Sequence, residues 1–448
     1  MKTLNTYILM AFLVISGKSL AQQTPAGKQT EAVTIVGATA HLGNGEVIEN
    51  SLVIFENGKL IEVIAANLTK RQYPGKIIDA KGKHVYPGFI APNSTLGLVE
   101  IAAVKATQDE DEMGEMLPNI RSLIAYNAES KIVESMRPNG VLLGQIVPRG
   151  GRISGTSSIV QFDAWNWEDA VVKEDDGLHI NWPDTYKRGS KWRGEDPNLK
   201  PNKSYVENVQ ELSDFFASAK AYLDGDRDYK NLPYLAMETV FGGEKKVFVH
   251  ANEEKAILDA IQFKKDQNLP HMVIVGGYYS TGVAEALKNN NIPVLVGRPH
   301  SVPEEAHEDY DYSYKLAGKL YEEGVLVAIE GSGQMERMNS RNLPFYAGTA
   351  AAFGMDKEDA LKLITLNTAK ILGIDENYGS LEKGKSATLF ISEGDALDMR
   401  GNILSHAYID GREISLETHQ TELWKRYSKK YKDQSGKEEI PTDSESSP

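Results

Sequence analysis

The chain has 448 residues, of which 41% are hydrophobic and 25% are charged, so it is long enough for one large domain with a smaller one. Its formal net charge of −14 argues against a nucleic-acid backbone as partner, because such a partner requires a basic face. The absence of cysteine excludes disulfides and thiolate chemistry. Any metal site must therefore use histidine, carboxylate or neutral oxygen ligands.

The N-terminus, MKTLNTYILMAFLVISGKSLAQQ, has the layout of a secretory signal peptide. Lys2 is basic, residues 7–15 are apolar, and Ser19-Leu20-Ala21 has the small residues of a cleavage site. The apolar run is too short to span a bilayer comfortably, which argues against the alternative of a retained anchor. We therefore predict a signal peptide over residues 1–21 and a protein exported to the periplasm or secreted.

Two β-rich segments flank the middle of the chain. Residues 32–86 contain β-branched runs joined at Asn57-Gly58, and residues 376–418 contain a similar pattern with Asp410-Gly411. Both dipeptides are strong hairpin signals. We expect the two segments to pair into one small composite β-sandwich.

The region between them, residues 87–375, alternates apolar strand patterns with helical ones, which predicts a parallel sheet with covered faces. The expected fold class is α/β, a (β/α)8 TIM-type barrel plus the β-sandwich. A weak fourth strand falls within 164–182 and precedes a polar loop over the barrel mouth, and the tail 432–448 has a disordered composition. The expected strands are 140–147, 157–163, 246–251, 271–277, 292–297 and 324–329, and the expected helices are 119–136, 253–267, 281–289, 313–323 and 356–373, the last capped by Asp356 and ended by Gly373.

Three stretches resemble the amidohydrolase superfamily, in its group of imidazolonepropionases and Xaa-Pro or Xaa-Arg dipeptidases. They are VYPGFI, VFVHA and ALKLITLNTAKILGIDENYGSLEKGKSATLFISEGDAL, and the resemblance covers residues 32–425. It implies a metal-bearing (β/α)8 barrel with a sandwich built from both chain ends. It also implies hydrolysis of a C–N bond.

The first strand departs from the family pattern, which ends it with Asp-x-His-x-His. Ala91 stands at the aspartate, Asn93 at the first histidine and Thr95 at the second. Side chains two residues apart on a strand point the same way, so Asn93 and Thr95 should face the barrel mouth. Their oxygens are poor substitutes for imidazole at a zinc site, so we also consider them as substrate-binding groups.

The remaining family positions leave His250 as the one clear imidazole ligand. Gly276-Gly277 stand where many members have another histidine, and Ser332 stands where the catalytic aspartate is expected, with Glu330 as the nearest carboxylate. A hydrolytic metal needs about three protein ligands plus an open position. The sequence therefore leaves three alternatives. One divalent metal, zinc by preference, is held by His250 with Glu330 and oxygens of Asn93 or Thr95; or there is no metal, with His250 and Glu330 as catalytic acid and base; or His250 is only packed in the barrel mouth and Glu330 only forms a salt bridge.

Three further features each allow two interpretations. The glycine-rich PRGGRISGTSS (148–158) carries Arg149 and Arg152, which either bind an anionic substrate end or belong to a flexible connection. His300 and His307 lie in an acidic loop that either forms a substitute metal site or is simply solvated. Four tryptophans either wall a ligand pocket or pack an insertion: Trp165, Trp167, Trp182 and Trp192.

Two functions follow. The first is an exported amidohydrolase-like hydrolase that acts on a small amide, cyclic imide or dipeptide with a reduced or rearranged metal site. The alternative is a catalytically inactive binding protein, or the inactive partner subunit of an active paralogue. Assembly into a homo-oligomer, or a hetero-oligomer with an intact paralogue, is compatible with either.

Overall fold

The computed structural model describes residues 24–66, 72–196, 198–227 and 229–435. The predicted signal peptide and the tail beyond residue 435 lie outside this part of the chain. Within it, every helix is too short or too polar to cross a bilayer.

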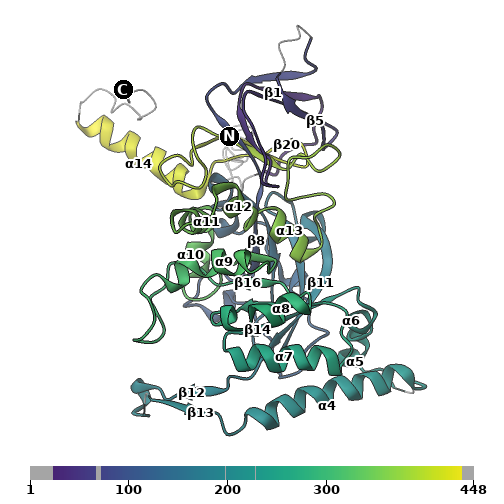
Figure 1. Cartoon of the computed structure of the whole chain (residues 1–448). Coiled ribbons are helices and arrows are strands. Elements are labelled where there is room, and N and C mark those ends of the chain that lie inside the picture. The colour runs from purple at the N-terminus through teal and green to yellow at the C-terminus, as the bar shows by residue number, and fades with distance from the viewer. Residues whose placement is uncertain (1–23, 67–71, 197, 228, 436–448) are drawn as a thin grey trace, which may run out of the picture.

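An eight-stranded, barrel-like sheet forms the centre of the molecule (Figure 1). The mixed α/β fold class is confirmed. The strands are hydrogen-bonded in the order β17-β16-β15-β14-β11-β10-β9-β8. Their bounds are β8 (Phe89–Ser94), β9 (Val141–Ile146), β10 (Ile153–Gln161), β11 (Val171–Asn181), β14 (Lys246–Ala251), β15 (Met272–Gly276), β16 (Val294–Val296) and β17 (Val327–Ile329).

The sheet differs from eight regular β/α units at β10, which runs antiparallel to both β9 and β11. Only residues 147–152 connect β9 to β10, and the short helix α3 (Trp167–Ala170) lies between β10 and β11. A parallel crossover needs a dozen or more residues, so these links permit only antiparallel pairing. The other neighbouring pairs are parallel, which brings the carboxyl ends of seven strands to one end of the barrel.

Three predicted helices are confirmed, namely α7 (Glu254–Asp266), α8 (Ala284–Asn289, preceded by the 3₁₀ helix η5, Ser280–Val283) and α9 (Tyr312–Glu322). The predicted helix 119–136 is wrong. That segment runs beside β10, with bridges from Met116 to Ile153 and from Arg121 to Thr156. It contains only the short turns η2 (Ser122–Ala125) and α2 (Lys131–Glu134), followed by η3 (Arg137–Asn139), and an earlier turn η1 (Lys105–Thr107) precedes it.

The segment after β11, which we expected to be a loop over the barrel mouth, contains some regular secondary structure. It contains a hairpin, β12 (Tyr186–Arg188) and β13 (Leu199–Pro201), with the turn η4 (Lys191–Arg193) between them. A helix absent from the sequence prediction follows, α4 (Tyr205–Asp224), which buries Leu212, Phe216 and Ala219 on one face. Two short helices, α5 (Leu232–Ala236) and α6 (Glu238–Gly242), lead into β14. In Figure 1, β12, β13 and α4 lie at the end of the molecule away from β1 and β5.

Two further sheets lie at the opposite end (Figure 1). A four-stranded sheet has the order β5-β4-β1-β6, and a six-stranded sheet, β20-β19-β18-β7-β2-β3, joins strands from both ends of the chain. Buried residues of both sheets form one apolar cluster. The bounds are β1 (Val33–Val36), β2 (Thr39–His41), β3 (Val47–Ile48), β4 (Ser51–Glu56), β5 (Lys59–Ala65), β6 (Lys76–Asp79), β7 (His84–Pro87), β18 (Leu389–Ser392), β19 (Leu404–Ile409) and β20 (Arg412–Glu413).

Both hairpin signals are confirmed. Glu56 pairs with Lys59 across Asn57-Gly58, and Ile409 pairs with Arg412 across Asp410-Gly411. The four turn residues have positive φ, between 48° and 78°, as a two-residue type I′ turn requires. The face-to-face sandwich and its domain boundaries stay predictions.

The predicted final helix is two helices, α12 (Lys357–Lys362) and α13 (Leu366–Leu372). Asp356 caps the first, and Gly373 ends the second in the left-handed conformation, as predicted. The break between these helices lies at the seam of the barrel-like sheet. There the described strands β8 and β17 form no backbone ladder with each other. At this seam Ile329 N donates to Leu363 O, and Ile90 N donates to Ile364 O. In a continuous helix these carbonyls would instead accept from amides four residues further along the chain.

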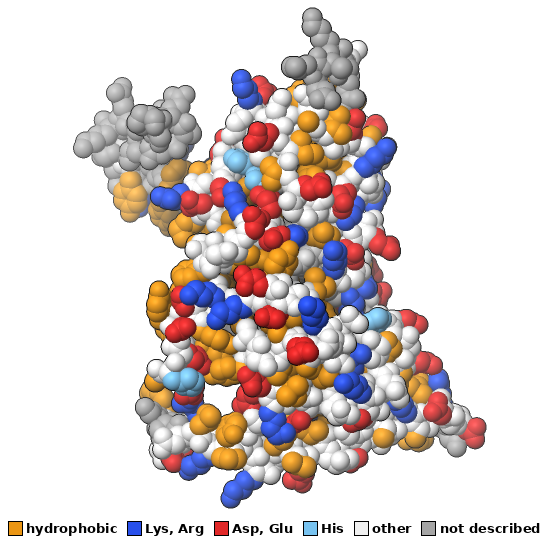
Figure 2. All heavy atoms as spheres, in the orientation of Figure 1, with side chains coloured by type: hydrophobic (Ala, Val, Ile, Leu, Met, Phe, Trp, Pro, Cys, Tyr) orange, Lys and Arg blue, Asp and Glu red, His pale blue; other side chains and the backbone are white. Residues whose placement is uncertain are grey.

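The described chain ends in α14 (His419–Ser435), which projects from the body in Figure 1. Residues 432–435 are helical, which corrects the predicted start of the disordered tail at 432. Figure 2 shows acidic and basic side chains interspersed over the visible face, with no large area of one sign. Two more helices, α10 (Glu336–Asn339) and α11 (Leu343–Ala352), are linked by η6 (Ser340–Asn342) and follow β17.

Candidate functional site

A cavity of about 660 Å³ opens at the carboxyl ends of the barrel strands, where active sites of such barrels lie. Four of the predicted site residues line it: Asn93 from β8, Arg152 from the glycine-rich segment, His250 from β14 and Glu330 after β17. Two predicted residues, Arg149 and Thr95, are not part of the described wall. The sequence prediction missed Arg298, which follows β16 and also lines the cavity.

Glu330 is buried, with 4% of its surface exposed. Its Oε2 accepts hydrogen bonds from Ser332 N (2.5 Å) and, more weakly, from Asn93 Nδ2 (3.4 Å). Burial raises the pKa of Glu330 above its ordinary value, although the Ser332 hydrogen bonds and the Arg149 charge oppose the shift. A carboxyl group with a raised pKa in a cavity holds a proton more readily than an exposed one, which suits a group that takes up and releases protons.

His250 begins a chain of hydrogen bonds that leads from the cavity into the barrel. Its Nε2 lies 3.0 Å from His179 Nδ1, and His179 Nε2 lies 3.0 Å from Ser157 Oγ. Ser157 Oγ donates to Asp176 Oδ1 at 2.8 Å. Because the Ser157 proton is directed to Asp176, His179 carries its proton on Nε2, and its Nδ1 accepts the proton of His250 Nε2.

Both imidazoles are neutral at pH 7. Burial, together with the charge of Arg149, lowers the pKa of His250 to about 3. Burial first, then His250 and Arg149, holds the pKa of His179 well below its usual value. In contrast, burial raises the pKa of Asp176, against the hydrogen bonds from Ser157 and Gln145. Burial thus disfavours the charged forms of His250, His179 and Asp176 along this chain of hydrogen bonds.

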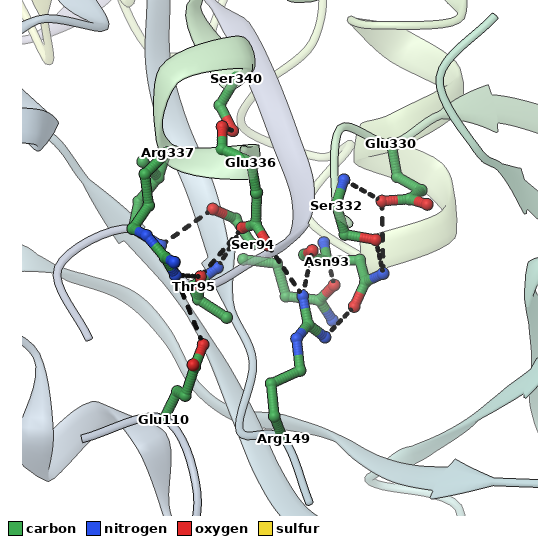
Figure 3. Close-up of polar contacts among 12 residues, drawn as sticks. Asn93, Ser94, Thr95, Glu110, Arg149, Glu330, Ser332, Glu336, Arg337 and Ser340 are labelled. Atoms are coloured by element: carbon green, nitrogen blue, oxygen red, sulfur yellow. Dashed lines mark hydrogen bonds and ion pairs between the residues drawn. The ribbon is translucent and has the colours of Figure 1, made fainter. Parts of the chain in front are cut away.

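Arg149 lies between the ends of β8 and the loop after β17 (Figure 3). Its Nη1 donates to Asn93 Oδ1 at 2.7 Å, and its Nη2 donates to Asn93 O at 2.9 Å. The same Nη2 lies 3.5 Å from Glu336 Oε2. Asn93 itself has a left-handed backbone, with φ of +52°, and its N donates to Gln145 Oε1. The guanidinium of Arg149 is therefore occupied by protein groups.

Thr95 takes part in the same cluster from the other side of Glu336. Thr95 N donates to Glu336 Oε1 at 2.6 Å, and its hydroxyl lies 3.2 Å from the same oxygen. Arg337 Nη1 contacts the Thr95 hydroxyl at 3.5 Å and Glu110 at 3.6 Å. Thr95 is thus directed toward Glu336 and does not belong to the described lining of the cavity (Figure 3).

The glycine-rich segment is held in place by β11. Arg152 Nη1 donates to Asn181 O at 2.8 Å, and Asn181 Nδ2 donates to Gly151 O at 2.8 Å. Gly150 and Gly151 both have positive φ, and a Cβ on Gly151 would lie 2.7 Å from Gly114 O. The glycines are therefore required by the backbone, while Arg152 still reaches the cavity wall.

The donor set does not fit a divalent metal, which the superfamily resemblance implies. Among the described residues no three His, Asp or Glu side chains gather as metal ligands. The two histidines at this site, His179 and His250, bond to each other through Nδ1 and Nε2. His300 instead bonds Thr349 Oγ1 at 2.7 Å, and His307 is exposed in its loop.

Only one of the four tryptophans reaches the cavity. Trp182 is buried, lines the wall and donates from Nε1 to Tyr205 Oη. Trp165 and Trp192 are exposed, which does not fit an aromatic wall.

The comparisons with known proteins agree with this architecture. The model of the Amidohydrolase family matches residues 315–420. A crystal structure of an amidohydrolase from Thermotoga maritima superposes with a TM-score of 0.74 at 25% identity, covering 86% of this chain and 99% of that one. Together these findings support the amidohydrolase superfamily for this chain.

The chain is also similar to an imidazolonepropionase and to a Xaa-Pro dipeptidase. An imidazolonepropionase from Flavobacterium psychrophilum is 29% identical over 108 residues, which are 22% of this chain and 26% of that protein. The match thus spans about a quarter of that relative's length. A Xaa-Pro dipeptidase crystallised with methionine in its active site has a TM-score of 0.52 at 14% identity, covering 86% of this chain and 100% of that one, which is a likeness of fold alone.

Proposed function

We propose that the chain is an exported hydrolase of the amidohydrolase superfamily that cleaves a C–N bond in a small amide, cyclic imide or dipeptide. The observation that carries the proposal is the meeting of Glu330 and His250 in one cavity at the carboxyl ends of the barrel strands. The names of the relatives support the bond type, since imidazolonepropionase and Xaa-Pro dipeptidase both denote hydrolysis of C–N bonds.

Glu330 is the base in this scheme. Its carboxylate takes a proton from the attacking water, and the resulting acid returns that proton to the leaving nitrogen. Its raised pKa suits both steps. Ser332 N and Asn93 Nδ2 hold the carboxylate in position. His250, as a neutral imidazole fixed by His179, faces the same cavity as a polar contact for the substrate.

Two guanidinium groups provide positive charge at the cavity. Arg152 donates to a backbone carbonyl, and Arg298, which also lines the cavity, interacts with the Tyr346 side chain and forms no ion pair with a carboxylate among the described residues. A cation without an acidic partner favours an anionic group on the ligand or negative charge that develops during reaction. Arg152 and Arg298 therefore fill the anion-binding role, with Arg298 in the place that the sequence suggested for Arg149.

Glu330→Gln tests the proposal. On a panel of N-acyl amino acids and dipeptides, kcat/KM should fall by about 10²- to 10⁴-fold, because the amide cannot shuttle the proton. Glu285→Gln, at an exposed position of α8, is the matched control and should retain full activity. An active wild type whose Glu330→Gln variant keeps its rate would rule out Glu330 as the base.

The inactive binding protein, alone or as partner of an active paralogue, is the second candidate. It is favoured by the fact that the described residues supply no three-ligand metal site. It predicts no turnover on the whole panel while one of those compounds still raises the melting temperature. Export is tested separately, by the mass of the mature N-terminus, which should begin after Ala21.

A further inference from the structure

The end of β8 is the position where the superfamily pattern places metal ligands, and in this chain a positively charged side chain occupies it. Arg149 extends from the glycine-rich segment and donates to both oxygens of Asn93 (Figure 3). We infer that the Arg149 guanidinium is the resident cation of this site and that no divalent metal binds at it in the working protein.

The oxygen donors at this position are already used. Asn93 Oδ1 and Asn93 O both accept from Arg149, and Glu336 Oε2 lies 3.5 Å from Arg149 Nη2. The other Glu336 oxygen accepts from Thr95 N at 2.6 Å. A metal at this point would have to displace a guanidinium that cannot lose its charge. It would also be repelled by that charge as long as the arginine stayed nearby.

The nitrogen donors are committed in a similar way. His250 Nε2 lies 3.0 Å from His179 Nδ1, and the second nitrogen of His179 bonds Ser157. A metal inserted between the two imidazoles would find two ligands, one short of the usual three. Glu330, a carboxylate that lines the same cavity, is held by the Ser332 amide at 2.5 Å.

Arg149 also positions other residues at this site. Arg149 holds Asn93, and Asn93 Nδ2 in turn lies 3.4 Å from Glu330 Oε2 and 3.2 Å from Ser332 Oγ. Glu330 and Ser332 lie on the other side of the seam between β8 and β17. A fixed cation thus helps to join the two strand ends through Asn93. This role of Arg149 is that of a positioning residue, and it holds whether or not the protein hydrolyses amides.

The test measures metal, so its outcome is separate from that of the activity assays. Untagged wild-type protein, purified without added metal and then dialysed against about 100 µM zinc and desalted, should contain less than about 0.1 equivalent by elemental analysis. Its melting temperature should be the same in zinc, in manganese and in EDTA.

His250→Gln separates the site from adventitious surface metal. Near-stoichiometric zinc in the wild type that disappears in His250→Gln overturns the inference, as does a zinc-induced rise in melting temperature that this variant lacks. Zinc that remains unchanged in His250→Gln is bound elsewhere and leaves Arg149 as the resident cation.

Discussion

The burial of His179 in β11 and His250 in β14 controls the protonation of both imidazoles. Both rings are neutral because burial removes them from water and Arg149 lies near them. In the unfolded chain they regain an ordinary pKa of about 6.5. The folded state therefore binds fewer protons than the unfolded state below that pH.

The resulting pH dependence is a testable prediction. Because both folded pKa values are lowered, stability is greatest above pH 6.5 and falls as the pH drops toward 4.5, by up to about 1.4 kcal/mol per pH unit for each imidazole. In urea denaturation followed across this range, His179→Gln and His250→Gln should each show a shallower fall than the wild type. His307→Gln, at an exposed loop position, should fall in parallel with it. A parallel fall in all three variants contradicts buried neutral histidines.

Sequence reasoning reached part of the site. His250 and Glu330 follow recognisable strand patterns, and the carboxyl ends of parallel strands meet. The contact between Arg149 and Asn93 could not be predicted, because it depends on how the loop between β9 and β10 lies against the end of β8. His179 was missed because its strand was poorly defined. The one available signal was its spacing of two residues before Asn181, which puts both on the same face of β11.

Among the elements, α12 depends on a cap that the sequence predicted. Asp356 Oδ1 accepts from Glu358 N (2.9 Å) and Asp359 N (3.1 Å). Asp356→Ala should lower the free energy of unfolding by about 1 kcal/mol, measured by chemical denaturation. Asp356→Asn keeps an accepting oxygen and should recover most of the loss. Equal losses in both variants would show that the charge, not the cap, stabilises the helix.

The predicted helix at 119–136 failed for a reason that spacing alone cannot reveal. Leu123 and Met136 are buried, as the pattern required, but they are buried from short turns beside β10. Ser122 Oγ bonds the carbonyls of Ile146 and Thr156, which ties the segment to two strands. Tertiary hydrogen bonds of this kind override helical periodicity.

At the scale of the whole molecule, Asp163 holds distant segments together. It is buried and pairs with Arg137 at 2.9 Å and with Arg412 of β20 at 3.0 Å. Its Oδ2 also accepts from Ala26 N. One carboxylate thus connects the barrel with strands and segments from both chain ends, which the sequence could not indicate because 249 residues separate Asp163 from Arg412.

Asp163→Ala should therefore destabilise the fold by about 3–5 kcal/mol, since it removes a buried negative charge that pairs with two guanidinium groups. Urea denaturation monitored by tryptophan fluorescence is the measurement. Asp163→Asn should lose less, and Asp226→Ala, at an exposed position, should lose almost nothing. A loss below about 1 kcal/mol in Asp163→Ala would mean that the three segments are held mainly by apolar packing.

The seam between β8 and β17 has a consequence for biogenesis. The edges of these two strands, which do not pair with each other, bond to the carbonyls of Leu363 and Ile364. These two residues leave the ribosome long after β8 has been made. Until then the nascent chain presents unpaired edges to other chains, the situation that invites aggregation. Products that stop before this turn should accumulate as insoluble material or be degraded, whereas products that stop after α13 should already possess a completed ring.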